Sequence, residues 1–419
     1  MAAPSGRGGR MPGLKLRTFS SFKSAPYRIY YASMAGNWAA MSMQMIVRSL
    51  LVYRLTGSAA LIGVLALAQA IPTMLMSIVG GTAADRMQKK RILLIGRLGS
   101  VVSALGIGIA LSLGFLSPGN PEAVGLLIAS AVLDGIISGF AQPALMSIIP
   151  EIVGKNELMN AISLSSVGQN IFRLMGPTLA GFLIDSYNFQ TVYFLMASLN
   201  AIAAVGTLFL PRSSVRATSN VSPLRNIIEA FQYIRRETIF LLIVVFAIGH
   251  MIGGMPYGQL LPVFTESILK VSATKMGLLS SVSGIGALVG TLVLASLPNR
   301  KRGLILILTG VGMGLPLIVF SFSHWWYLSL AMMPLIGLAP TLHGAVTSTL
   351  IQSYAAPEYR ARMQSFFAMA QGLAGFASFV AGMLAGAIGV QWAVGGMALL
   401  LVIISIVFWV FAPRLRKLD

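Results

Sequence analysis

The sequence predicts an all-α membrane protein, with twelve transmembrane helices arranged as two pseudo-symmetric six-helix bundles. Three observations lead to this fold class. First, 56% of the 419 residues are hydrophobic and 10% are charged, whereas an ordinary soluble domain is about 25% charged. Second, the chain contains twelve stretches of about 20 mainly apolar residues, the length that crosses a bilayer as a helix. Third, one long polar segment separates six of these stretches from the other six.

The twelve predicted spans share an apolar composition over the thickness of a bilayer. In chain order they cover residues 30–53, 60–82, 92–115, 123–148, 160–184, 191–211, 240–264, 276–297, 304–322, 327–350, 364–388 and 392–412. The predicted domains are a basic tail (1–29), an N-terminal bundle (30–211), a linker (212–239), a C-terminal bundle (240–412) and a second tail (413–419).

The linker contains a segment that is typical of a surface helix. Ser222 and Pro223 suit a helix cap and a first-turn proline. Apolar residues then recur at helical spacing at Leu224, Ile227, Ile228, Phe231 and Ile234. This pattern indicates an amphipathic helix on the membrane surface, and a simple tether is the alternative.

The net charge of +19 comes from 30 Lys and Arg against 11 Asp and Glu. Such an excess is typical either of nucleic-acid binding or of cationic loops on the cytoplasmic side of a membrane. With the N-terminus inside, 24 of the 30 cations fall on the cytoplasmic side of the predicted spans. We therefore expect a multi-pass protein of the cell (inner) membrane, with both termini in the cytoplasm, surrounded by lipid and needing no nucleic acid.

The sequence offers no signature of an enzyme. It contains no cysteine, which excludes disulfides, thiolate metal sites and cysteine nucleophiles. Its three histidines and eleven acids are too scattered for a catalytic or metal-binding cluster. A phosphate-binding loop of the G-x-x-x-x-G-K-S/T type is also missing. We expect no enzyme activity, no metal and no cofactor, and a proton gradient rather than ATP as the energy source.

The N-terminal and C-terminal halves of the chain have similar sequences in corresponding connections between spans. Ile149-Pro150-Glu151 follows the fourth span, and Ala356-Pro357-Glu358 follows the tenth. Weak internal symmetry of this kind is typical of transporters whose binding site lies between two repeats.

The connection after the second span carries the strongest motif. Its residues Gly81, Asp85, Arg86, Lys89 and Lys90 resemble the major facilitator superfamily signature G-x-x-x-D-R/K-x-G-R/K-R/K, with Gln88 in place of the second glycine. The resemblance implies a latch that joins the two halves on the cytoplasmic side, with Arg360 and Arg362 as partners. Gly81 would allow close helix contact. The alternative is that the cations only fix topology.

A second group of residues narrows the resemblance. In the fifth span, Asn170 and Arg173 precede Gly176, Pro177 and Gly181. Two further segments belong to the same pattern, Leu51–Ala59 before the second span and Gln352–Arg362 before the eleventh. Together these are similar to the bacterial branch of multidrug, macrolide and enterobactin exporters. Gly176, Pro177 and Gly181 resemble the superfamily motif G-P-x-x-G-G, which implies antiport. Simple helix packing is the alternative interpretation.

Charges inside the predicted spans are candidates for the mechanism, because placing them there is costly. Asp134 and Arg173 each lie about halfway along a span, so we expect them to pair. The pair is either a fixed structural contact or a proton-binding site whose acid responds to the movement of Arg173. His250 and His343 could also titrate, although each is more simply a lone hydrogen-bonded helix contact.

The substrate cavity is expected from family geometry between the first, fourth, seventh and tenth spans. Methionine and aromatic side chains suit varied apolar ligands. The candidate lining residues are Trp38, Met41, Gln44, Met45, Arg48, Met251, Met255 and Tyr257. Arg48 near an outer helix end either snorkels to the surface or attracts an anion, and Arg97 is expected to anchor its helix.

These observations predict a secondary transporter that exports amphipathic small molecules (drugs, macrolides or siderophores) by proton-driven alternating access and acts as a monomer. Two alternatives remain open from the sequence. One is uptake or flipping of an anionic or lipid-like substrate. The other is a non-transporting receptor or assembly protein that keeps the fold.

Overall fold

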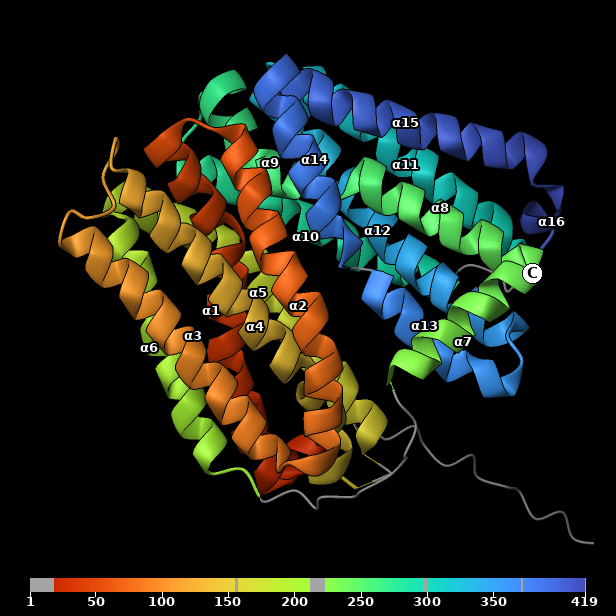
Figure 1. Cartoon of the computed structure of the whole chain (residues 1–419), viewed down its shortest axis with the longest axis horizontal. Coiled ribbons are helices and arrows are strands. Elements are labelled where there is room, and N and C mark those ends of the chain that lie inside the picture. The colour runs from red at the N-terminus through yellow and green to blue at the C-terminus, as the bar shows by residue number, and fades with distance from the viewer. Residues whose placement is uncertain (1–18, 155–156, 212–222, 297–299, 371, 419) are drawn as a thin grey trace, which may run out of the picture.

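The computed structural model describes residues 19–154, 157–211, 223–296, 300–370 and 372–418, and all regular structure in these ranges is helical (Figure 1). The all-α prediction is therefore confirmed. Nine helical stretches among the described residues are long and apolar enough to cross a membrane. They are Ala59–Ala84, Lys89–Ser112, Glu122–Ile152, Phe189–Leu208, Thr238–Ile268, Ala273–Leu294, Arg302–Phe322, Trp326–Tyr354 and Val390–Phe411.

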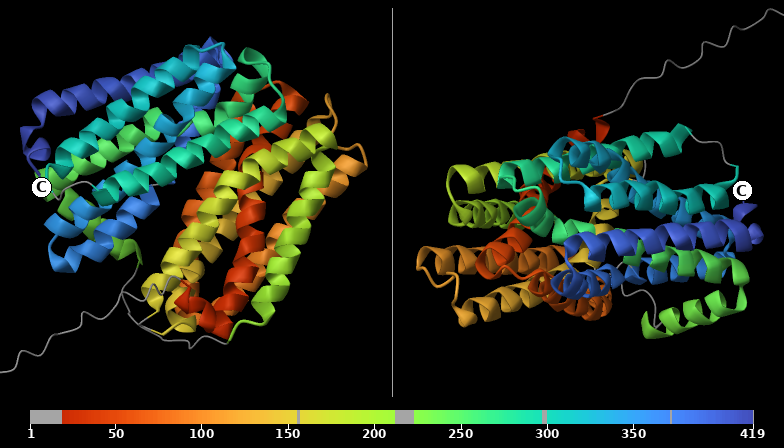
Figure 2. Two further views of the ribbon diagram at one scale, coloured as in Figure 1. Left: turned by 180° about the vertical axis from the view of Figure 1, so that it is seen from behind. Right: turned by 90° about the horizontal axis from the view of Figure 1, so that it is seen from above.

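The helices form two groups that lie side by side (Figures 1 and 2). After a short 3-10 turn, η1 (Ser20–Lys23), the first group contains α1 (Ala25–Thr56), α2 (Ala59–Arg86), α3 (Lys89–Ser112), α4 (Pro121–Ile152), α5 (Leu158–Ser186) and α6 (Phe189–Leu208). The second contains α8 (Thr238–Gly254), α9 (Tyr257–Val263), η2 (Phe264–Ile268), α10 (Ala273–Ser296), α11 (Arg302–Phe322), α12 (Trp326–Tyr354), α14 (Leu373–Ile388), α15 (Val390–Phe411) and α16 (Pro413–Arg416).

Three predicted spans are not among the nine apolar stretches. Helices α1 and α5 are long enough, with 32 and 29 residues, but the polar residues in each lower its mean hydropathy. The predicted span 364–388 is interrupted, because α13 (Pro357–Ala370) ends just before Gly372 and the apolar helix α14 has only 16 residues. A helix of this length is about 24 Å long, shorter than the apolar core of a bilayer.

The seventh predicted span is bent rather than straight. Helix α8 ends at Gly254, and α9 begins at Tyr257 after Pro256. Proline has no backbone N–H and clashes with the preceding turn, so it interrupts the helix here. A π-helical turn, η2, then follows.

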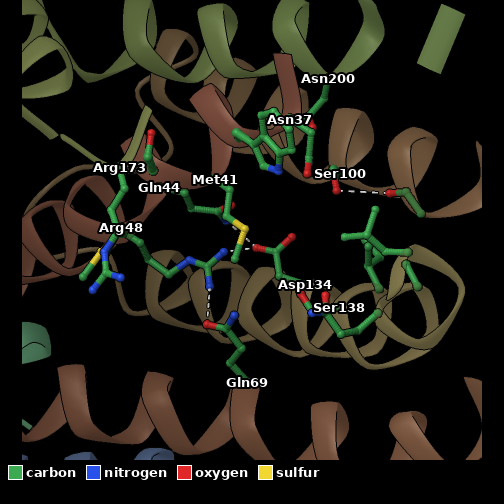
Figure 3. Close-up of a pocket in the computed structure, with 18 of the residues that line it drawn as sticks. Asn37, Met41, Gln44, Arg48, Gln69, Ser100, Asp134, Ser138, Arg173 and Asn200 are labelled. Carbon is green, nitrogen blue, oxygen red and sulfur yellow. Dashed lines mark hydrogen bonds and ion pairs between the residues drawn. The ribbon is translucent and has the colours of Figure 1, made fainter. Parts of the chain in front are cut away.

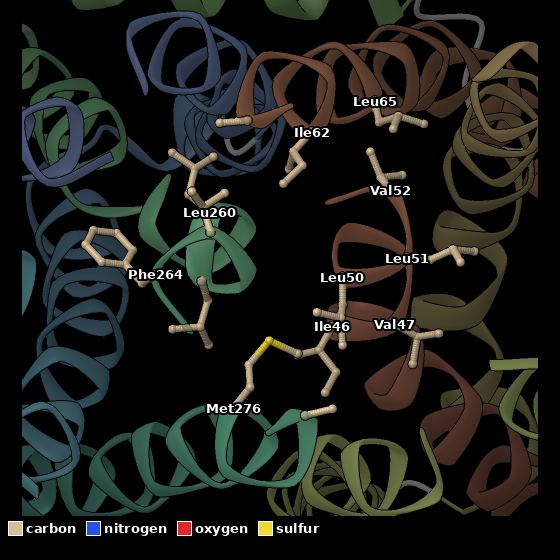
Figure 4. Close-up of a cluster of buried hydrophobic side chains, with 14 of the residues drawn as sticks. Ile46, Val47, Leu50, Leu51, Val52, Ile62, Leu65, Leu260, Phe264 and Met276 are labelled. Carbon is tan, nitrogen blue, oxygen red and sulfur yellow. The ribbon is translucent and has the colours of Figure 1, made fainter. Parts of the chain in front are cut away.

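The two groups meet at one end of the molecule and diverge at the other. We call the end where α2 meets α3 (Arg86–Lys89) the basic end, and the end where α1 meets α2 (Thr56–Ala59) the opposite end. At the opposite end, a buried cluster joins α1 and α2 to α9, η2 and α10 across the two groups (Figure 4). Its members include Ile46, Leu50, Ile62, Leu260, Phe264 and Met276. Toward the basic end, where α7 and α13 lie, the groups diverge (Figure 1).

Small residues allow α5 and α10 to touch backbone to backbone across the two groups. A Cβ atom placed on Gly277 would lie 2.3 Å from the carbonyl oxygen of Pro177, and one on Gly181 would lie 2.1 Å from that of Ala273. In lipid, close packing of this kind is what holds helices together, because apolar burial gains little there. The contact therefore depends on glycine at both positions.

The linker helix α7 (Pro223–Arg236) is present where the sequence predicts a helix. It packs on α13, where the rings of Tyr233 and Tyr359 stack at 4.3 Å, and Glu229 pairs with Arg362 at 2.8 Å. The predicted basic tail up to residue 18 and the linker residues 212–222 lie outside the described residues.

Candidate functional site

A cavity of about 570 Å³ lies in the first group of helices, a size suited to a small molecule (Figure 3). Its lining comes from α1 to α6, with Gln259 of α9 from the second group. The polar residues that line it are Asn37, Ser42, Gln44, Arg48, Ser49, Gln69, Arg97, Ser100, Asp134, Ser138, Gln142, Gln169, Asn170, Arg173, Asn200 and Gln259. The cavity runs from Arg48 near the closed opposite end toward Arg97 near the basic end.

Asp134 is the centre of a hydrogen-bonded group in this cavity. Its carboxylate pairs with the guanidinium of Arg48 and accepts a hydrogen bond of 2.7 Å from Nε2 of Gln44. Arg48 also donates a hydrogen bond of 3.2 Å to Oε1 of Gln69 (Figure 3). Asp134 is 7% exposed and Arg48 is 9% exposed. A buried carboxylate is thus held by one cation and one amide.

The sequence explains why these side chains converge. Gln44 and Arg48 are four residues apart on α1, so they lie on one helix face. Asp134 is brought near by close packing of α4 on α2, where a Cβ atom on Gly135 would lie 2.3 Å from the carbonyl oxygen of Gln69. The same contact places the Gln69 side chain within reach of Arg48.

The predicted pairing of Asp134 with Arg173 is wrong in this structure. Helices α4 and α5 follow one another in the chain but make few contacts, because α5 packs mainly on α1 and α10 while α4 packs on α2 and α3. Arg48 of α1 takes the place expected for Arg173. Its predicted snorkelling to the surface is also wrong, since it is buried against Asp134. Arg173 lines the same cavity as an exposed cation.

The structure divides the proposed cavity residues by helix group. Trp38, Met41, Gln44, Met45 and Arg48 all line the cavity from α1. The candidates from the second group do not line it. Met251 is buried in a separate apolar cluster, with 2% of its surface exposed, and Met255 lies at the end of α8. The hydroxyl of Tyr257 lies 3.3 Å from the hydroxyl of Ser283. Apart from Gln259 of α9, the cavity in this conformation is therefore lined by the first group of helices.

His250 and His343 form a pair, whereas the sequence suggested two lone contacts. Their rings stack at 4.0 Å, within 3° of parallel, between α8 and α12. Both are buried, and Nδ1 of His343 lies 3.3 Å from the hydroxyl of Thr309. The pair does not line the cavity.

The latch motif is arranged differently from the expectation. Lys89 pairs with Glu151 of α4, and Lys90 donates a hydrogen bond of 2.9 Å to the carbonyl of Leu210. Close helix contact occurs at Gly80, where a Cβ atom would lie 2.6 Å from the carbonyl of Phe140. A Cβ atom on Gly81 would meet no atom within 4 Å, so the packing role expected for Gly81 is wrong here.

The expected latch partners are engaged elsewhere in this conformation. Arg362 pairs with Glu229 of α7, and Arg360 donates a hydrogen bond of 3.1 Å to the carbonyl of Ala355. Arg86 is exposed at the end of α2. The side chain of Asp85 lies outside the described part of the structure.

The Gly-Pro motif of α5 lies at helix contacts on two sides. A Cβ atom on Gly176 would lie 1.9 Å from the hydroxyl of Ser42 on α1. Pro177 and Gly181 face α10 of the other group at Gly277 and Ala273. The motif therefore forms part of the surface on which the two groups meet.

Polar contacts also close the opposite end. Arg54 at the end of α1 pairs with Glu266 of η2 at 2.8 Å. Asp185 at the end of α5 accepts hydrogen bonds from the backbone N–H groups of Ala273 (3.1 Å) and Thr274 (2.7 Å), which begin α10. A carboxylate from one group thus caps a helix of the other.

We expect Asp185→Ala to loosen this closed end. A lost cap costs about 1 kcal/mol, or about a fivefold shift in the open population. Because the chain has no cysteine, Leu50→Cys in the buried cross-group cluster provides a unique reporter thiol. Maleimide labelling of this thiol should become about fivefold faster when Asp185→Ala is added.

The control is Asn188→Ala, which removes a similar cap within one group, since Asn188 accepts from Thr191 N–H at 2.8 Å. Its labelling rate should stay unchanged, and equal rates in both variants would exclude a gating role for Asp185. Burial alone would raise the pKa of Asp185, but hydrogen bonds from Thr274, Ser272 and Ala273 lower it overall. The cap therefore persists at neutral pH and is lost only as pH falls below about 4.

Sequence reasoning missed Gln69 as a partner of Arg48 and the amide contact between Asn37 and Asn200, whose Nδ2 and Oδ1 atoms lie 3.3 Å apart. Each is a polar residue inside a mainly apolar stretch. Such residues in a span face the protein interior rather than lipid, and this signal could have identified them.

The sequence is similar to that of known membrane transporters. The model of the Major Facilitator Superfamily matches residues 29–379 and residues 268–418. The enterobactin exporter EntS of Citrobacter koseri is 26% identical over 304 residues, which cover 71% of this chain and 67% of that protein. EntS of Salmonella typhimurium is 26% identical over 291 residues, or 69% of this chain and 68% of that protein.

Solved structures share the fold at lower identity. The nucleoside transporter NupG gives a TM-score of 0.73 at 16% identity and covers 93% of this chain and 99% of its own. A bacterial homologue of the human lysosomal transporter Spinster, in an inward-facing and unoccupied conformation, gives a TM-score of 0.70 at 16% identity and covers 96% and 98%. At these identities the likeness concerns the fold alone.

Proposed function

This chain belongs to the major facilitator superfamily, and on that premise we propose that it is a proton-coupled secondary transporter that exports amphipathic small molecules by alternating access. The protein is a multi-pass membrane transporter and not an enzyme.

We propose twelve spans in two six-helix bundles, with α1, α5 and the α13–α14 run added to the nine apolar stretches. We take the basic end as the cytoplasmic end, with both chain termini on that side, because the positive-inside rule assigns 24 of the 30 cations in the sequence to the cytoplasmic side of the predicted spans. The conformation is then inward-facing: contacts at Arg54 and Asp185 close the outside, and the groups diverge toward the cytoplasm.

The single observation that carries the coupling proposal is the buried contact of Asp134 with Arg48 in the cavity. A buried carboxylate is stable as an anion when a cation touches it, and it favours the neutral acid when the cation moves away. Movement of α1 against α4 between conformations would therefore load and release a proton. The pair of His250 and His343 is the second candidate, because it lies outside the cavity.

Export is the direction that the relatives favour, since the curated proteins named above are enterobactin exporters. The cavity lining supports a substrate with both apolar and polar parts, because Trp38, Met41 and Met45 lie beside amides and charges. We propose that one chain performs the whole cycle, without a cofactor and with the proton gradient as its energy source.

The test is transport by the full chain in proteoliposomes with an imposed pH gradient. The substrates are ethidium, erythromycin and 2,3-dihydroxybenzoylserine, which represent a cationic dye, a macrolide and a siderophore fragment. We expect at least one to move against the proton flow and to stop when nigericin removes the gradient. Substrate transport that continues unchanged after nigericin is added would refute proton coupling. If none of the three substrates is transported or exchanged across the membrane, transport of these substrate classes would be refuted.

A further inference from the structure

Arg97 of α3 is a buried cation that the cycle above does not use. It lines the cavity and is 9% exposed. Within the described part of the chain, its guanidinium has one hydrogen-bond partner, the thioether sulfur of Met34, at 3.2 Å from Nη2, and its Nε has none. A thioether is a weak acceptor, so both the charge and the donors of Arg97 are left largely uncompensated.

The cavity as a whole carries excess positive charge. Arg48, Arg97 and Arg173 line it together with one carboxylate, that of Asp134, among the described residues. Arg48 already pairs with that carboxylate. A cavity lined by one sign of charge concentrates ligands of the other sign, so this cavity favours an anion.

Arg97 is also separate from the proton site. A Cβ atom on Gly96 of α3 would lie 3.2 Å from Ala141 and 3.7 Å from Ile137 of α4, which puts the neighbouring Arg97 at the level of these two residues. From that level Asp134 is about one and a half helix turns away, or about 8 Å along the helix axis. A ligand anion at Arg97 would leave Asp134 free to exchange its proton.

We propose that Arg97 is the anion-binding residue of the cavity and that the substrates are amphipathic organic anions, with an apolar body and a carboxylate, sulfonate or phenolate group. The unpaired guanidinium receives the anionic group, and Trp38, Met41 and Leu93 of the lining contact the body. A guanidinium binds such groups with two parallel N–H donors. This inference rests on the proposed function only in taking the cavity as the substrate site.

The test compares two probes of equal shape, 2-naphthoate and its neutral amide 2-naphthamide. Binding to the full chain is measured by calorimetry in phosphatidylcholine nanodiscs, so no transport or proton gradient is needed. We expect the wild type to prefer the carboxylate by about tenfold, and Arg97→Gln to abolish this preference while binding of the amide changes less than about twofold. Arg97→Lys should recover part of the preference, and Arg28→Gln, at an exposed cation, should change nothing.

Thermal unfolding without ligand separates a binding role from a structural one. Removing an uncompensated buried charge should raise the midpoint of unfolding for Arg97→Gln. A lower midpoint together with an unchanged carboxylate preference would overturn the proposal and leave Arg97 as a structural anchor. Because binding is measured without transport, failure of the coupling proposal would not affect this result.

A lipid headgroup could supply the same anionic chemistry, and a second arm distinguishes it. Nanodiscs that contain phosphatidylglycerol should leave the affinity for 2-naphthoate unchanged. The proposal of a soluble anionic substrate fails, and the occupant is a lipid, if three results occur together. Phosphatidylglycerol alone stabilises the wild type, Arg97→Gln removes that stabilisation, and 2-naphthoate does not bind.

Discussion

Replacement of Asp134 by Asn is expected to lower transport driven by a pH gradient by about 100-fold, which corresponds to about 2.7 kcal/mol. Asn has nearly the same shape and can keep the hydrogen bond from Gln44, but it cannot bind and release a proton. Exchange of labelled for unlabelled substrate across the membrane, without a gradient, should continue. Both rates can be measured in the same proteoliposomes.

Two variants make this result specific. Asp185→Asn changes an acid outside the cavity and should keep gradient-driven transport. Since Asp134→Asn leaves Arg48 buried without its partner, which is itself destabilising, the double variant Asp134→Asn with Arg48→Gln restores a neutral pair. It should fold normally and still lack coupling. Full gradient-driven transport by either Asp134 variant would remove Asp134 from the coupling mechanism.

The second large effect is expected for Gly277→Leu. A Cβ atom at this position lies 2.3 Å from the carbonyl oxygen of Pro177, and a backbone atom cannot move aside without moving α5. The opposite end should therefore fail to close. We expect gradient-driven transport to fall about 100-fold, and maleimide labelling of the reporter thiol in the Leu50→Cys background to become at least about tenfold faster.

The matched control is Gly125→Leu near the start of α4, because a Cβ atom there would meet no atom within 4 Å. It should transport and label like the parent. If Gly277→Leu closed normally, with slow labelling and normal transport, the contact between α5 and α10 would not be the point at which the two groups separate.

Much of the fold could be predicted because hydropathy reports directly on exposure to lipid. The apolar stretches, the polar linker and the α7 helix all follow from composition and periodicity. The interruption before α14 was missed, since residues 364–388 are continuously apolar enough to suggest a single span. Hydropathy averages over a window and is insensitive to a local break beside one glycine.

The candidate site was only partly predictable, because the sequence gives the depth of a charge but not the rotation or the neighbours of its helix. Asp134 and Arg173 both line the cavity, but packing between helices that are distant in the sequence pairs Asp134 with Arg48 instead. The stacking of His250 on His343 likewise joins two helices that are far apart in the sequence. Such pairings depend on tertiary packing, which a single sequence does not encode in any local pattern.

The proton on Asp134 can itself be observed by spectroscopy. Infrared difference spectra of the full chain in lipid, recorded on acidification, detect the C=O stretch of a protonated carboxylic acid buried in the protein. We predict such a band in the wild type, its disappearance in Asp134→Asn, and its persistence in Asp185→Asn. A band of equal size in the wild type and in Asp134→Asn would contradict the claim that Asp134 carries the transported proton.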